Sequence, residues 1–134
     1  VLASSCITNS SMPELLLGNP DPKLAPAPDL LAAAESLAVK AAAELRVGKI
    51  FTTDIFYEPD NDLQARMLSN EVLCVEMETA ALYAIAELEG KKALSVVTIS
   101  DHLTSGLALS SSDREKSLDK MIEFSLDLAG AATE

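Results

Sequence analysis

The segment Thr98 to Gly106, which reads TISDHLTSG, ends an apolar run with residues that can do chemistry. The run Ala93 to Ile99 stops at Ser100 and Asp101, and the chain's only histidine, His102, follows. A carboxyl group at the end of a buried strand can act as a general acid or base. An acidic residue after a strand is also a common turn former, so Asp101 taken alone leaves both interpretations open. His102 fits a loop hydrogen bond as well as a proton carrier, and we assign it no role.

Two further groups of candidate residues lie at the ends of other predicted strands. Phe56 and Tyr57 end one strand, and the acidic pair Glu76 and Glu78 flanks Met77 at the end of another. Paired carboxylates suit acid–base work, although a solvated strand edge explains them about as well. Phe56 is compatible with a core position as well as with a stacking platform. Ligands of open α/β sheets bind outside the carboxyl ends of the strands, so we expect the three groups to share one site.

Arg114 is a fourth candidate because of its position in the last predicted helix. It falls in the first helical turn, where the helix dipole disfavours a cation, and Asp113 beside it offsets only part of that cost. This placement indicates either an anionic group close to Arg114 or an exposed arginine that a long acidic helix tolerates.

The alternation of apolar patterns predicts the elements that position these residues. The predicted strands cover Val1 to Thr8, Lys49 to Phe56, Val72 to Glu78 and Lys92 to Ser100. The predicted helices cover Leu30 to Leu45, a short segment LQARML, Thr79 to Glu89 and a last helix that opens at Ser112 and is stopped by Gly130. Asn9 to Pro28 holds five of the six prolines and is expected to be an irregular loop. The order predicts a single domain over residues 1–134, a three-layer α/β/α fold with a mostly parallel or mixed sheet.

Local signals place the helix ends. Asp29 is expected to cap the first long helix, and Ser112 with Glu115 forms a predicted capping box for the last. Gly90 is expected in the left-handed position after the helix that begins at Thr79, and that helix is almost wholly apolar, which predicts burial.

Composition narrows the class of protein. The chain has 134 residues, 49% of them hydrophobic, and a net charge of −11, which disfavours nucleic acid and anionic lipid as partners. No apolar run is long enough for a membrane span, so we expect a cytoplasmic protein. Cys6 and Cys74 lack metal-ligand spacing and are expected to be reduced core thiols, and no metal site is expected. The opening VLASSCIT starts without methionine in a strand-like context, and we expect the chain to be the later portion of something longer.

Four stretches together resemble one family, the bacterial-type hexameric purine nucleoside phosphorylases. These stretches are FTTDIFYEPD, VEMETAALYAIAELEGKKAL, TISDHLTSG and DREKSLDKMIEFSLDLA. The resemblance runs from about Val47 to Leu128 and covers the C-terminal portion of the family's chain. It is specific because F-Y-x-P-D, V-E-M-E and S-D-H occur together at these spacings.

The resemblance implies a role for each candidate residue. Phe56, with Tyr57, would pack on the purine ring. Met77 would lie under the ribose and Glu78 would accept hydrogen bonds from its hydroxyls, with Glu76 beside them. Ser100 and Asp101 would meet the base edge, Asp101 would be the general acid, and Arg114 would help it protonate the base. The implied partners are a purine nucleoside and inorganic phosphate as co-substrate, without a cofactor, in a homo-oligomer that is a hexamer by resemblance.

The implied reaction gives the strand-terminal carboxyl group a purpose. Cleaving the bond between a purine and its sugar leaves negative charge on the base, and a carboxylic acid at N7 stabilises that charge. Asp101 must be protonated to do this, so we expect the site to desolvate it in part. The family's phosphate-binding motifs, of the types G-D-P-x-R and R-x-G-S/T-C-G, do not occur in this sequence. We therefore expect that the chain alone does not carry out phosphorolysis.

Three alternatives remain open at this point. The methylthioadenosine/adenosylhomocysteine nucleosidases also carry a V-E-M-E run but use water, and uridine phosphorylases resemble the same run without the purine-directed aspartate. A third alternative is a non-catalytic module that keeps the nucleoside pocket or the oligomer contacts.

Overall fold

The computed structural model describes residues 1–57, 63–103 and 105–131, and its centre is a parallel sheet of three strands. The strands are β1 (Leu2–Thr8), β2 (Val47–Thr52) and β3 (Cys74–Glu76), in that spatial order. β1 is paired with β2, and β2 with β3, all in parallel register. Parallel strands need long crossovers, and helical segments supply them here. All three strands coincide with predicted ones, although β2 and β3 are shorter than expected.

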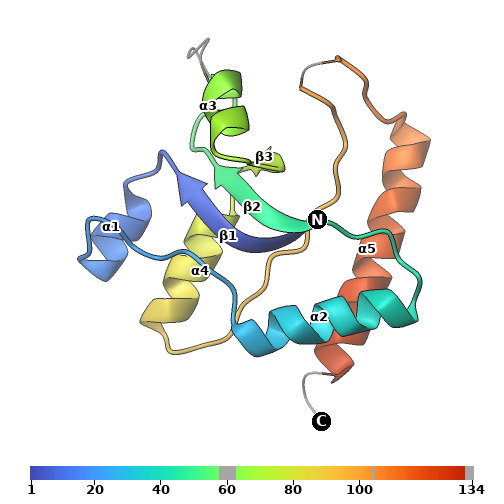
Figure 1. The fold of residues 1–134 in the computed structure, drawn as a ribbon, viewed down its shortest axis with the longest axis horizontal. Helices are drawn as coiled ribbons and strands as arrows, with labels where there is room; N and C mark the ends of the chain where they lie inside the picture. The colour runs from blue at the N-terminus through green and yellow to red at the C-terminus, as the bar shows by residue number, and fades with distance from the viewer. Residues whose placement is uncertain (58–62, 104, 132–134) are drawn as a thin grey trace.

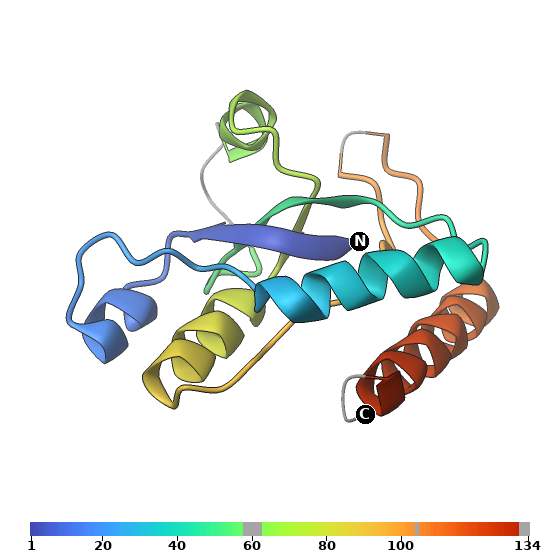
Figure 2. The same cartoon turned by 60° about the horizontal axis from the view of Figure 1, so that its bottom comes forward.

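Helices cover both faces of this sheet, as the sequence predicts. The helices are α1 (Met12–Leu17), α2 (Pro28–Lys40), α3 (Leu63–Ser69), α4 (Thr79–Leu88) and α5 (Ser111–Ala131). Figure 1 shows α4 crossing behind β1 and β2, with α2 and α5 beside the N-terminus. Figure 2 shows α3 on one side of the sheet and the other four helices on the opposite side. The fold is therefore a layered α/β arrangement.

The main core lies between the sheet and α4. Cys6, Ile50 and Cys74 are register partners on neighbouring strands, and all three are buried against the face that α4 covers. Tyr83 of α4 packs into the same cluster and is only 3% exposed. A second cluster joins Leu2 of β1 to helices α2 and α5. Burying a side chain of leucine or isoleucine size stabilises a fold by about 1.5–3 kcal/mol, so these clusters anchor the sheet.

The apolar segment 93–99 differs from its prediction as a strand. It meets β1 through one antiparallel bridge, Leu2 to Val96, with backbone hydrogen bonds from Ala3 N–H to Ser95 (3.1 Å) and from Val97 N–H to Val1 (2.9 Å). β1 begins at Leu2, so the segment runs past the end of its neighbour after Val97. A strand needs a partner along its length, and the described residues provide one only for the first part of this segment.

The proline-rich loop contains a helix that the sequence did not predict. Proline blocks helix interiors, but Pro13 lies in the first turn of α1, where its missing N–H has no intrahelical partner to lose. Pro13 is also buried. The rest of the segment 9–28 has little regular structure, and a bridge between Cys6 and Leu24 holds it to β1.

The two ends of α2 also differ from expectation. Asp29 lies inside the first turn instead of capping it, and its carboxylate is paired with Lys92. The helix ends at Lys40, and Ala42 follows with φ +48°. Ala43 N–H reaches back to Ala38 C=O (3.0 Å), which is the bond of a Schellman motif. An alanine occupies the position where glycine usually signals this ending, so the sequence did not mark it.

The last two helices give mixed results for the predicted signals. Gly90 adopts φ +60° after α4, as predicted. In α5 the cap lies two residues earlier than expected, because Ser110 Oγ accepts a hydrogen bond from Asp113 N–H (3.1 Å) and donates one to the Asp113 carboxylate (2.6 Å). The helix also continues through Gly130 to Ala131.

The apolar helix α4 is buried along one side only. Thr79, Ala80, Tyr83 and Ala84 face the sheet, whereas Leu82, Ile85 and Leu88 are between 43% and 52% exposed. The expectation that the whole helix is buried is therefore not met by the described residues. Within the described part of the chain, no helix is both long and apolar enough to cross a membrane.

Candidate functional site

Glu76 lies where β3 passes into α4, and its carboxylate is held from within the fold. One oxygen, Oε2, accepts hydrogen bonds from Glu78 N–H (2.9 Å), Thr79 N–H (2.7 Å) and the Thr79 hydroxyl (2.8 Å). The other oxygen accepts a hydrogen bond from the Thr52 hydroxyl. A carboxylate near a helix N-terminus satisfies backbone N–H groups that have no intrahelical partner. The Glu76 side chain therefore accepts hydrogen bonds from N–H groups at the start of α4, although Glu76 precedes the helix by three residues.

Glu78 differs from Glu76 in exposure and in backbone conformation. It is the N-cap residue of α4 with φ −127° and ψ −31°, so the two glutamates do not lie on one side of a continuous extended strand. Its side chain is exposed, and one oxygen accepts a hydrogen bond from Met77 N–H (3.1 Å). Met77 is 38% exposed. The structure thus presents Glu78 and Met77 at the surface and keeps Glu76 occupied.

Asp101 and Arg114 form an ion pair, although 12 residues separate them in the chain. Arg114 Nη2 lies 3.6 Å from Asp101 Oδ1, and the Ser100 hydroxyl donates to the other carboxylate oxygen. Of the two possibilities that the sequence left open for Arg114, the structure shows the first, because an anionic group, the Asp101 carboxylate, lies close to it. The Asp101 side chain is 53% exposed, so the described residues do not supply the partial desolvation expected for a proton donor.

The loop between Asp101 and α5 folds back on itself like a hairpin. Asp101 and Ala108 form an antiparallel bridge, His102 N–H donates to Leu107 C=O (2.7 Å), and Leu109 N–H donates to Ser100 C=O (2.8 Å). This return brings the start of α5, and with it Arg114, close to Asp101. The ring of His102 accepts a hydrogen bond at Nδ1 from Ser105 N–H (3.2 Å), in agreement with a role inside the loop.

Phe56 and Tyr57 lie in the chain after β2, beyond the strand that they were expected to end. Their rings contact each other edge to face, with centroids 5.0 Å apart, and both are strongly exposed, at 75% and 87%. A core position for Phe56 is thereby ruled out among the described residues. The remainder of the motif that follows them, residues 58–62, lies outside the described residues.

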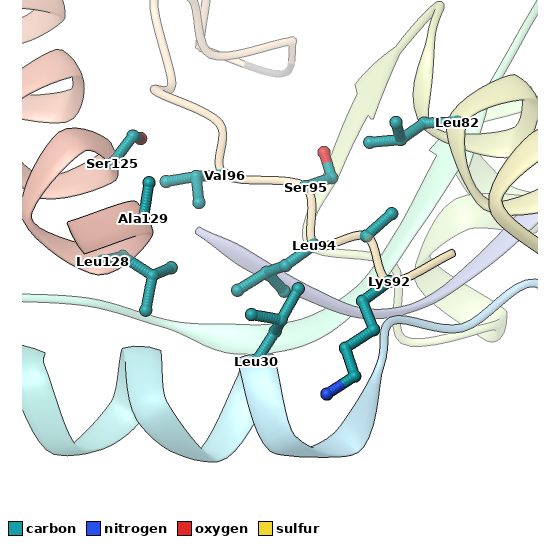
Figure 3. A pocket seen from close by; sticks show the side chains of 10 residues that line it. Leu30, Leu82, Lys92, Leu94, Ser95, Val96, Ser125, Leu128 and Ala129 are labelled. Carbon is teal, nitrogen blue, oxygen red and sulfur yellow. The ribbon is translucent and has the colours of Figure 1, made fainter. Parts of the chain in front are cut away.

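The three groups stay separate within the described part of the chain. No hydrogen bond, ion pair or ring contact among the described residues joins Phe56, Glu78 and Asp101 to one another. A cavity of about 510 Å³ lies elsewhere, between α2, α4, α5 and segment 92–96. Figure 3 shows its lining, with Val96 directed toward Ala129 of α5 and Leu94 toward Leu30 of α2. The predicted convergence of the three groups stays a prediction.

Sequence reasoning missed three buried polar residues that form hydrogen bonds around Glu76 and the start of α4. Thr52, Thr79 and Ser95 are between 1% and 8% exposed, and Thr79 Oγ1 lies 2.7 Å from Ser95 Oγ. Ser95 is the only residue of the run Ala93 to Val97 with a polar side chain. A lone polar residue in an apolar run was therefore the available signal, since buried polar groups need partners.

Burial raises the pKa values of three side chains, Cys6, Cys74 and Tyr83, and so favours their neutral forms. Burial raises the pKa of the Cys74 thiol to about 11 and that of the Tyr83 phenol to about 12, and it also raises the pKa of Cys6. Both cysteines are free and buried. In the part of the chain that the structure describes, no group of three or more histidine, cysteine or acidic side chains is arranged to hold a metal ion.

Comparison with known proteins identifies the family. A purine nucleoside phosphorylase of the DeoD type from Geobacillus sp. (strain WCH70) is 41% identical over 131 residues, which cover 96% of this chain and 54% of the relative. A relative of the same name from Roseobacter denitrificans is 42% identical over 77% of this chain and 44% of its own length. A third, from Myxococcus xanthus, is 44% identical over 65% of this chain and 36% of its own length.

These relatives are longer than the matched region. The chain spans about half the length of the curated relatives that match it over nearly all of its residues. The profile of the phosphorylase superfamily matches residues 5–133, which is almost the whole sequence. The chain therefore belongs to the phosphorylase superfamily.

Proposed function

We propose that this chain supplies the base-binding and ribose-binding part of a purine nucleoside phosphorylase, which cleaves a purine nucleoside with inorganic phosphate to free base and ribose 1-phosphate. The relatives that carry this name support the substrate class. No cofactor is part of the proposal, because phosphate is the second substrate. We further propose a cytoplasmic homo-oligomer with a role in purine salvage.

The observation that carries the proposal is the cluster of Ser100, Asp101 and Arg114. Two donors, a hydroxyl and a guanidinium, meet one carboxyl group that is still half exposed. In the proposed reaction, Asp101 donates a proton to the purine as the bond to the sugar breaks. Arg114 then stabilises the carboxylate that remains, because an adjacent cation favours the charged form.

The other candidate residues have roles that fit their exposure. Phe56 and Tyr57 offer aromatic faces for the purine, since both rings are open to a ligand. Glu78 offers carboxylate oxygens to the ribose hydroxyls, with Met77 under the sugar. A bound nucleoside would bring these groups together and remove Asp101 from water.

The test is an intact-mass measurement of the native protein, coupled to a nucleoside cleavage assay with and without phosphate. Phosphate-dependent release of purine supports the proposal, whereas release without phosphate would identify a nucleosidase. Nucleoside binding without turnover by the chain of 134 residues alone is the result expected for the base and ribose part by itself. Failure of the native protein to bind any purine nucleoside would refute the proposal.

Asp101→Asn in the native protein tests the proton donor. We expect this variant to keep nucleoside binding and to lose turnover by about 10²- to 10⁴-fold, the usual contribution of general acid catalysis. The matched control is Asp113→Asn, which changes a neighbouring carboxylate that accepts a hydrogen bond from Ser110, the cap of α5, and takes no part in the Asp101–Arg114 ion pair. Unchanged turnover in Asp101→Asn would remove this residue from the mechanism.

A further inference from the structure

Hydrogen bonds from within the fold already engage both oxygens of Glu76. A carboxylate has about four lone-pair positions, two on each oxygen. Oε1 accepts a hydrogen bond from the Thr52 hydroxyl, and Oε2 accepts three, from the Glu78 N–H, the Thr79 N–H and the Thr79 hydroxyl. Oε2 therefore has no position left for a sugar hydroxyl, and Oε1 has one. Glu78 accepts one hydrogen bond from the Met77 N–H and keeps its remaining positions open.

Thr52 is the deepest member of this arrangement. Its side chain is 2% exposed, and its hydroxyl donates to Glu76 while accepting a hydrogen bond from Ala80 N–H (3.0 Å). A hydroxyl with one donated and one accepted bond has a fixed direction. Thr52 thus fixes both the carboxylate of Glu76 and the first turn of α4, and it lies too deep to touch a ligand.

Thr79 extends the arrangement toward the segment that ends in Asp101. The Thr79 hydroxyl donates its one hydrogen to Glu76. In the hydrogen bond between Thr79 Oγ1 and Ser95 Oγ (2.7 Å), the Ser95 hydroxyl must therefore be the donor. The Ser95 N–H in turn donates to the Tyr83 hydroxyl (3.2 Å). We call Thr52, Glu76, Thr79 and Ser95 the Glu76 network. It joins β2, the start of α4 and segment 93–99 through hydrogen bonds, and three of its members, Thr52, Thr79 and Ser95, are buried. Hydrogen bonds among buried groups make such a network rigid.

We propose that Glu76 is a positioning residue and that the Glu76 network orients Glu78 toward the ribose. This inference rests on the proposed function and gives Glu76 a positioning role, where the family resemblance placed it among the residues that bind the ribose. The backbone N–H of Glu78 is tied to Glu76, so the Glu78 side chain leaves the backbone in a set direction. A ligand group held in advance binds without first having to be ordered.

Thr52→Val tests the proposal, with Thr52→Ser as its matched control. Valine keeps the shape of threonine and removes the hydroxyl, whereas serine keeps the hydroxyl. The binding readout is the affinity for a purine ribonucleoside divided by the affinity for its 2′,3′-dideoxy analogue. We expect the ratio to fall by roughly tenfold or more in Thr52→Val, as for loss of a hydrogen bond to a charged group, and to recover in Thr52→Ser. Affinity for the free purine base stays unchanged, which a general loss of structure would not allow.

A second readout needs no ligand and therefore separates this proposal from the proposed function. Hydrogen exchange measured by NMR is expected to accelerate at the Glu78 and Thr79 N–H groups in Thr52→Val and to stay slow in Thr52→Ser. Glu76→Gln serves if Thr52→Val does not fold, because an amide nitrogen cannot accept a hydrogen bond. It is expected to lower the affinity ratio and to accelerate the same two N–H groups.

The two readouts distinguish failure of the positioning role from failure of the proposed function. An unchanged affinity ratio, or unchanged exchange at both N–H groups, in the folded variant would overturn the positioning role. A wild-type protein that binds no purine nucleoside would instead refute the proposed function, and the exchange measurement would still decide whether the Glu76 network holds Glu78.

Discussion

Tyr83→Phe is expected to destabilise the fold strongly, because it removes one buried hydroxyl that bonds two segments. The hydroxyl donates to Ala3 C=O (2.6 Å) in β1 and accepts from Ser95 N–H (3.2 Å) in segment 93–99. The side chain is 3% exposed. Phenylalanine keeps the ring and its packing, so the change isolates the hydrogen bonds.

The magnitude follows from the two bonds. Each is worth about 1 kcal/mol, and a buried donor left without a partner costs about 1–3 kcal/mol. We expect a loss of about 2–4 kcal/mol in the free energy of unfolding, out of the roughly 5–15 kcal/mol typical of a native domain. The melting temperature is expected to fall by roughly 6–15 °C for a chain of this size.

The assay is urea unfolding followed by far-ultraviolet circular dichroism, with Tyr57→Phe as the matched control. The chain has two tyrosines, and the side chain of Tyr57 is 87% exposed. The control is expected to change stability by less than about 0.5 kcal/mol. Equal midpoints for the two variants, with equal slopes, would refute the reasoning, because they would show that the Tyr83 hydroxyl does not hold segment 93–99 to β1.

Two further predictions use the same unfolding assay. Ser110→Ala removes the cap of α5 and is expected to cost about 1 kcal/mol, whereas Ser112→Ala, at the position that the sequence favoured, is expected to cost much less. A larger loss in Ser112→Ala would contradict the observed cap. The second prediction concerns alkaline pH, where the buried Cys74 and Tyr83 hold their protons more tightly in the folded chain because their pKa values are raised from 9.0 and 10.0 to about 11 and about 12. Their contribution to the free energy of unfolding is present in full below about pH 9. It declines between pH 9 and 12, because the unfolded chain releases its protons at lower pH than the folded chain does. Cys74→Ala is expected to flatten this decline, and an identical pH profile in that variant would contradict it.

Much of the scaffold was predictable because its signals are local. The run VLASSCIT is apolar and strand-like, and it became β1. Gly90 marks the end of α4 because glycine adopts a positive φ without strain. The capping and ending signals failed where a neighbour competed for the residue. Asp29 is paired with Lys92, and Ser110 caps α5 ahead of Ser112.

The candidate residues could be selected from the sequence, and their roles in binding and catalysis stay predictions. The sequence selected Asp101 and Arg114 and left open whether Arg114 has an anionic neighbour, and the structure shows that it is paired with Asp101. The residue pattern alone paired Glu76 with Glu78, and only the resemblance assigned the ribose hydroxyls to Glu78. In the structure Glu76 accepts hydrogen bonds from Thr52 and from the start of α4, while Glu78 faces solvent.

The amino-acid sequence by itself indicated the family, three of the four predicted strands and most of the described helices, since these depend on residue patterns within short stretches. Tertiary structure decided which carboxylate is free to bind and which is occupied. It also decided that segment 93–99 is held by Tyr83 and Ser95 instead of extending the sheet. The physical reason is that each polar group has a limited number of donor and acceptor positions, and residues far apart in the chain, such as Thr52 and Glu76, reach one another to fill them only after folding.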